Sequence, residues 1–144
     1  MNALAAAALA AGELMCEFHD GYRKSLIAEL SGDAPRVEMM LFYEALREDS
    51  AEVLSTRRPG RRTVRVRAAG EQLHLIEHDG PSVRVTTLTE CTRTKLRADG
   101  EVCTRFNARH AWHFDSTTHL DPEAAAARLP SGAATGNCEP WRIE

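Results

Sequence analysis

Four of the six histidines occur as two close pairs, and imidazole is the side chain that most often binds metal ions in proteins. His74 and His78 share one face of a predicted strand but lie ~13 Å apart, whereas His110 and His113 face opposite sides of another. Neither pair alone can hold one metal ion. A metal site built from His74, His78, His110 and His113 is therefore an alternative that needs the fold to bring separate strands together.

Acid–base hydrolysis is a second alternative. Its candidate groups are Glu77, His78, His113 and Asp115, which combine carboxylates with imidazoles. The sequence contains neither a G-x-S-x-G nucleophile motif nor a glycine-rich phosphate loop. No catalytic residue and no cofactor are assigned from the sequence, and an enzyme is the less favoured interpretation.

Arginine forms the densest group of like charges in the chain. The guanidinium group forms paired hydrogen bonds with carboxylates and phosphates, so a basic face on a protein of net charge −3 favours an anionic envelope ligand or an acidic protein partner. The alternative is a solvated strand face whose arginines pair with acids such as Glu52 and Glu71. No aromatic side chain lies nearby, so nucleic acid is not an expected partner. Six of the sixteen arginines fall within eleven residues: Arg57, Arg58, Arg61, Arg62, Arg65 and Arg67.

The four cysteines are Cys16, Cys91, Cys103 and Cys138, and no two of them form a C-x-x-C pair. This spacing disfavours zinc and thioredoxin-like sites and favours two disulfides in an oxidising compartment. Three pairings are possible, and the sequence does not choose among them. One of them closes a short loop between Cys91 and Cys103 and ties Cys16 to Cys138. Four reduced cysteines in a cytosolic protein are the alternative.

The first residues are alanine-rich. Ala8-Leu9-Ala10 has the small-residue pattern of a signal-peptide cleavage site, although the usual positively charged start is missing. Residues 1–12 are therefore predicted to be a signal-peptide remnant or an N-terminal helix, since alanine is the best helix former. With the even cysteine count this favours a periplasmic or secreted protein, and sixteen arginines against two lysines indicate a bacterial source. No apolar run reaches the ~20 residues of a transmembrane helix.

Period-two alternation dominates the middle of the chain. It predicts strands at 63–67, 73–77, 82–88, 92–96, 102–106 and 110–114, with turns at Gly70, Asp79-Gly80-Pro81 and Asp99-Gly100. Two further short strands are expected within 17–30. Residues 37–46 fit a strand buried on both faces somewhat better than a helix. A short helix is expected at 122–129 behind Asp121-Pro122, followed by a small-residue loop over 131–137.

These patterns define one domain over residues 13–144, with 43% hydrophobic and 27% charged residues. The expected fold is mainly β, a small antiparallel sandwich or barrel of about seven to nine strands with one short C-terminal helix. The leading functional hypothesis is an exported, disulfide-stapled binding module without enzymatic activity, which takes an anionic ligand or protein through the arginine cluster.

Overall fold

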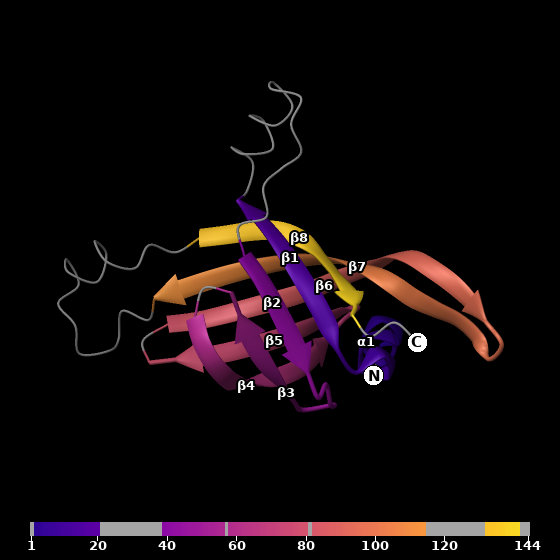
Figure 1. Ribbon diagram of the computed structural model, residues 1–144, viewed down its shortest axis with the longest axis horizontal. Coiled ribbons are helices and arrows are strands. Elements are labelled where there is room, and N and C mark those ends of the chain that lie inside the picture. Colours follow the sequence, from indigo (N-terminus) through magenta and orange to yellow (C-terminus); the bar gives the residue numbers. More distant parts are fainter. Residues whose placement is uncertain (1, 21–38, 57, 81, 115–131, 142–144) are drawn as a thin grey trace, which may run out of the picture.

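The fold is a closed antiparallel barrel, seen here in a computed structural model that describes residues 2–20, 39–56, 58–80, 82–114 and 132–141. Each strand pairs with the next, and the last returns to the first (Figure 1). The mainly β prediction is confirmed, as a barrel rather than a sandwich, and the helix expected at 122–129 lies outside the described residues. The described elements are α1 (Ala3–Ala11), β1 (Leu14–Asp20), β2 (Met39–Glu44), β3 (Ser50–Ser55), β4 (Arg58–Ala69), β5 (Gln72–Asp79), β6 (Ser82–Arg97), β7 (Gly100–Phe114) and β8 (Gly132–Pro140).

Strand β2 shows how side-chain alternation builds the core. Met39, Leu41 and Tyr43 are buried inside the barrel, whereas Met40 and Phe42 are only partly buried. The strand prediction for this segment is confirmed, but burial on both faces is wrong. A closed barrel has one interior, so successive side chains alternate between the core and the outer surface.

Short turns join the strands of the central meander where glycines were expected to place them. Gly70 and Gly80 have φ angles of 57° and 56°, which only glycine adopts readily, and they connect β4 to β5 and β5 to β6. The separate strands predicted at 82–88 and 92–96 are one continuous strand, β6, and those at 102–106 and 110–114 are one strand, β7. Three register shifts bend this pair without ending it.

The seam between β1 and β8 closes the barrel. The sequence predicted a loop over 131–137, and the structure corrects this to strand β8. Small residues suit the seam because the two backbones approach closely: a Cβ atom at Gly136 would overlap the backbone oxygen of Glu17. Cys16 and Cys138 are buried register partners across the seam and form a disulfide. The first and last strands are therefore joined covalently as well as by hydrogen bonds.

Helix α1 closes one end of the barrel. Leu4, Ala5 and Ala8 belong to the buried core. Asn2 caps the helix by accepting a hydrogen bond from the Ala5 amide at 2.7 Å, and its side-chain amide donates to the backbone oxygens of Gly70 and Gln72 at 2.8 and 3.0 Å. Residues Ala3–Ala11 form a helix whose inner face belongs to the hydrophobic core, while the signal-peptide interpretation of residues 1–12 stays a prediction.

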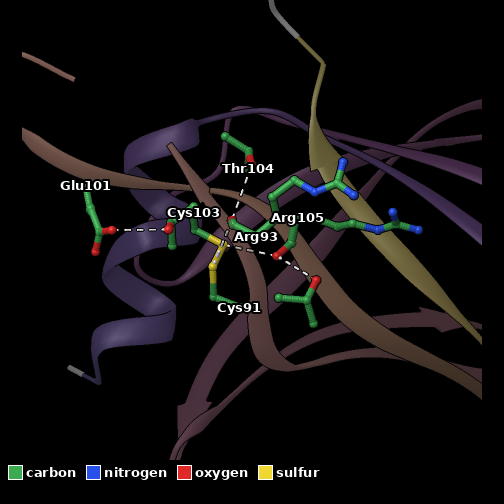
Figure 2. Close-up of a disulfide and its surroundings, with 8 residues drawn as sticks. Cys91, Arg93, Glu101, Cys103, Thr104 and Arg105 are labelled. Atoms are coloured by element: carbon green, nitrogen blue, oxygen red, sulfur yellow. Dashed lines mark hydrogen bonds between the residues drawn. A yellow bond between two sulfur atoms is a disulfide. The ribbon is translucent and has the colours of Figure 1, made fainter. Parts of the chain in front are cut away.

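The β6–β7 hairpin extends past the barrel as a two-stranded arm (Figure 1). A second disulfide, Cys91–Cys103, links the two strands of this arm (Figure 2). Both disulfides thus follow one of the three pairings that the sequence left open. No cysteine in the chain is free.

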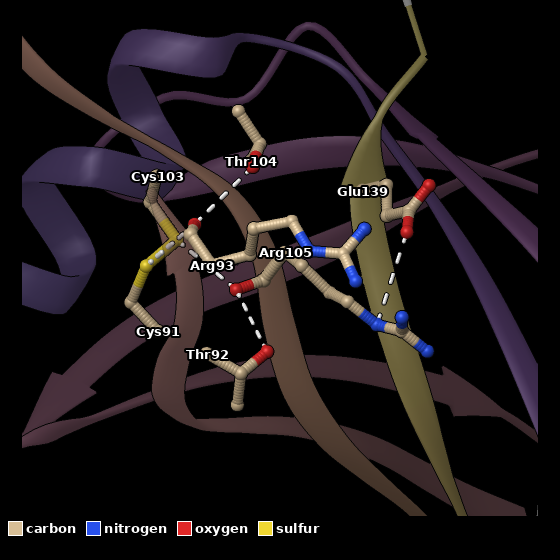
Figure 3. A network of polar contacts seen from close by, with 7 residues as sticks. All are labelled: Cys91, Thr92, Arg93, Cys103, Thr104, Arg105 and Glu139. Atoms are coloured by element: carbon tan, nitrogen blue, oxygen red, sulfur yellow. Dashed lines mark hydrogen bonds and ion pairs between the residues drawn. A yellow bond between two sulfur atoms is a disulfide. The ribbon is translucent and has the colours of Figure 1, made fainter. Parts of the chain in front are cut away.

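Polar contacts stiffen the base of the arm (Figure 3). The Thr92 hydroxyl donates to the Arg105 backbone oxygen at 3.4 Å, and the Thr104 hydroxyl donates to the Arg93 backbone oxygen at 3.3 Å. The Arg105 side chain lies 3.8 Å from the Glu139 carboxylate, which connects the arm to β8. The arm is therefore fixed to the barrel wall at its base.

Candidate functional site

The end of the barrel away from α1 contains polar side chains that point inward. Asn2 attaches α1 to the turn before β5, whereas Glu77 lies at the other end of that strand. Glu77, Thr86 and His110 are the buried polar residues of the described chain, on β5, β6 and β7. Glu77 and His110, together with Arg62 and Arg84, line a cavity of about 110 Å³. That space accommodates a small polar group or a few water molecules.

A chain of hydrogen bonds crosses the barrel beside this cavity. The Tyr43 hydroxyl on β2 lies 2.5 Å from the Thr86 hydroxyl on β6, which lies 2.9 Å from Nδ1 of His110 on β7. Because β2 and β6 are four strands apart in an eight-stranded ring, the first of these bonds spans the interior. Burial raises the pKa of Tyr43 above its ordinary value, so its hydroxyl keeps its proton.

One arrangement of the protons satisfies both hydroxyl groups of this hydrogen-bond chain. If Tyr43 donates to Thr86 and Thr86 donates to Nδ1 of His110, both hydroxyl protons are used and the imidazole proton lies on Nε2. The reverse direction leaves the Tyr43 proton without an acceptor among the described residues, which is costly for a buried hydroxyl. His110 therefore presents an Nε2–H donor. That nitrogen is buried and has no hydrogen-bond partner.

His110 is neutral at pH 7. Burial, followed by the positive charge of Arg84, lowers the pKa of His110 from 6.5 to about 4. The residue is 2% exposed, and the rings of Phe18 and Trp112 lie near its imidazole, with centroids at 5.3 and 6.0 Å. The ring is thus fixed by aromatic neighbours and by Thr86.

Among the described residues, three charged side chains line the cavity. Arg62 forms an ion pair with Glu77, and Arg84 adds a second guanidinium group. Two positive charges and one negative charge leave one net positive charge. The Nε atom of Arg84 is buried and has no hydrogen-bond partner. Two residues that line the cavity, Arg84 and His110, thus each have a buried N–H donor without an acceptor among the described residues.

The opposite wall is mainly aliphatic, although Tyr43 on β2 and Ser55 on β3 also line it. Met39 and Leu41 on β2 and Val53 on β3 line the same cavity as Arg84 and His110. Strands β2 and β3 lie across the ring from β6 and β7. A bound molecule would therefore meet hydrogen-bond donors on one side and aliphatic carbon on the other.

The structure divides the arginine cluster between two faces of β4. Arg62 points into the barrel, whereas Arg61, Arg65 and Arg67 are exposed on the outside. Arg61 lies 3.0 Å from Glu44 and 3.4 Å from Glu52, the second of which the sequence suggested as a partner. Arg57 and the side chain of Arg58 lie outside the described part of the chain. Three of the four arginines whose side chains are described thus share the outer face of β4, while Arg62 lies inside.

The four histidines of the metal hypothesis do not converge. His110 lies inside the barrel, while His78 and His113 are exposed on its outer surface. His74 faces outward beside Thr87, with Nδ1 and the hydroxyl 2.9 Å apart. The described residues contain no group of three or more histidine, cysteine, aspartate or glutamate side chains placed to hold a metal ion.

The hydrolase residues are also separated, because Glu77 points inward while His78 and His113 point outward. Asp115 lies outside the described residues. Sequence reasoning did not single out Arg84 and Thr86, although the signal was present. The period-two pattern places both on the same face of their strand as Leu88, and an arginine in register with core positions marks an interior charge.

A larger hollow of about 570 Å³ lies between the end of α1, the arm and the end of β8. Its charged lining includes both Lys95 and Glu139, so it has no single charge preference. The orphan donors of His110 and Arg84 both line the barrel cavity instead. The barrel cavity is therefore the better candidate site.

Comparisons with protein-family models, with curated proteins and with solved structures found no match. Within the described part of the chain, no helix has the length and apolar character needed to cross a membrane.

Proposed function

We propose that the protein is a non-enzymatic binding module that takes up a small anion in the barrel cavity. The observation that carries this proposal is the pair of buried donors without partners, Nε of Arg84 and Nε2 of His110, in one cavity. Each unpaired buried donor costs about 1–3 kcal/mol. An anion that accepts from both groups removes that cost on binding.

The charge of the site supports an anion over a cation or a neutral molecule. Among the described lining residues, Arg62, Arg84 and Glu77 leave one net positive charge in a partly buried setting, where an uncompensated charge is costly. An eight-stranded barrel is also just wide enough to hold one small ligand. A bound monoanion balances the site.

Binding without catalysis fits the state of the titratable groups. Glu77 is engaged by Arg62, and the Nδ1 atom of His110 is engaged by Thr86. With a pKa of about 4, His110 is not protonated at neutral pH and cannot serve as a general acid there.

We further propose that the protein is exported, to the periplasm or to the cell exterior. The two disulfides support this proposal, because such bonds persist in oxidising compartments. Arg65 and Arg67 are exposed on the outer face of β4, where their positive charges would pair with an acidic protein partner. That surface is a weaker candidate than the cavity, since solvent satisfies its side chains.

A thermal-shift experiment tests the cavity proposal. Acetate, chloride, sulfate and phosphate are added to the wild-type protein, to Arg84→Gln and to the matched control Arg65→Gln, with the bulky sulfonate sodium HEPES at equal ionic strength as the blank. An anion at one hundred times its dissociation constant stabilises the folded state by about 2.7 kcal/mol, or about 8 °C in Tm for a domain of this size.

We expect at least one anion to stabilise the wild-type protein and Arg65→Gln, but not Arg84→Gln. If the anion raises the Tm of Arg84→Gln as much as that of the wild-type protein, the cavity is ruled out as the anion site. Loss of the effect in Arg65→Gln alone would move the site to the outer face of β4.

A further inference from the structure

We propose that the ligand is a short aliphatic monocarboxylate, held with its carboxylate at Arg84 and His110 and its carbon chain against the wall formed by Met39, Leu41 and Val53. This inference rests on the proposed anion site and names the chemical class of its ligand. Three features of the cavity carry it: the arrangement of the donors, the apolar wall and the position of Glu77.

The two donors come from neighbouring strands. Thr86 and His110 are register partners on β6 and β7, and Arg84 lies two residues before Thr86 on the same face of β6. Arg84 and His110 are therefore diagonal neighbours, which are separated by ~7–8 Å between their Cα atoms and within reach of long side chains. Two N–H groups from such a pair match the two oxygens of one carboxylate. The planar guanidinium group favours planar acceptors.

The apolar wall specifies the rest of the ligand. Met39, Leu41 and Val53 offer only aliphatic carbon and a thioether, whereas Tyr43 and Ser55 line the cavity on the same two strands. A hydroxyl or amino group placed against the three apolar side chains would lose its hydrogen bonds to water. An alkyl chain instead gains from burial. Each added methylene that fits should tighten binding about threefold to fourfold.

Glu77 limits the charge of the ligand. Its carboxylate lines the same cavity, and Arg62 already balances it, which leaves one positive charge for the bound molecule. The second negative charge of sulfate or phosphate would lie near Glu77 without a partner. The volume of about 110 Å³ sets a further limit, because the gain per methylene ends when the chain outgrows the cavity.

The test is an NMR titration of the wild-type protein, with dissociation constants taken from backbone amide shifts. The probes are acetate, propionate, butyrate and octanoate, together with sulfate and phosphate, at equal ionic strength and pH 7. We expect affinity to rise about threefold or more from acetate to propionate and again to butyrate, without further gain at octanoate. Sulfate and phosphate should bind at least tenfold more weakly than butyrate.

Two results would overturn the inference in different ways. If sulfate or phosphate binds as tightly as butyrate and chain length has no effect, an anion site exists but is not a monocarboxylate site. If none of the probes shifts any amide in the folded protein, the anion site itself is refuted. Glu77→Gln serves as a second variant, whose folding is checked by its melting curve. In this variant the ratio of the sulfate dissociation constant to the butyrate dissociation constant should fall at least threefold. An unchanged ratio would refute the role of Glu77.

Discussion

The hydrogen-bond chain from Tyr43 to His110 should depend on the Thr86 hydroxyl. Thr86→Val keeps the shape of the side chain but removes the atom that bonds Tyr43 at 2.5 Å and His110 at 2.9 Å. All three residues are buried, so bulk solvent does not reach the groups that lose their partner. Two groups are left unpaired at about 1–3 kcal/mol each, and we expect a total loss of about 3 kcal/mol in the free energy of unfolding.

Urea unfolding of a double-mutant cycle measures this effect. Tyr43→Phe removes the hydroxyl that Thr86→Val leaves unpaired, so the double variant should be more stable than the sum of the two single losses predicts, by about 1–2 kcal/mol. The geometry of this hydrogen-bond chain would be refuted if the free energy of unfolding of Thr86→Val lay within about 0.5 kcal/mol of the wild-type value. It would also be refuted if the losses in the two single variants were additive within error.

Two further predictions concern the disulfides and pH. Removing the seam disulfide Cys16–Cys138 should cost about 5 kcal/mol by loop entropy, against about 3 kcal/mol for Cys91–Cys103 in the arm. Melting curves of the two double-alanine variants should show this order, and equal losses would contradict it. The pKa of His110 is about 4 in the folded protein and 6.5 in the unfolded chain. The free energy of unfolding should therefore fall by about 3 kcal/mol as the pH is lowered from 6.5 toward 4. Urea midpoints at pH 7.5 and 4.5 should therefore fall more in the wild type than in His110→Gln, and parallel declines would refute this role.

The sequence predicts the middle of the barrel wall, β4 to β7, well because these strands carry a local signal. The alternation at 63–67 and 82–88 already separates inner from outer side chains, and the turns follow from glycine and proline. Strand β8 has no such signal. Its small residues fit only because Gly136 meets the backbone of Glu17, which lies more than one hundred residues earlier in the chain.

The candidate site depends on contacts that no local pattern contains. Tyr43 meets Thr86 across the interior, so their pairing requires the closed ring. The arginine cluster was interpreted as one surface because β4 was expected to start at residue 63, whereas it starts at Arg58. Extending the strand places Arg61 and Arg62 on opposite faces, and the interior arginine then pairs with Glu77.

The most direct measurement follows the side-chain N–H signals of Arg84 and His110 in a nitrogen-15 spectrum at pH 7 while propionate is added. Arg84→Gln and His110→Gln identify the two signals. A bound carboxylate should shift both signals saturably and with one shared dissociation constant, because each N–H gains an acceptor. If both signals stayed in place with propionate, acetate, sulfate and phosphate while the protein remained folded, the anion site in the barrel would be contradicted.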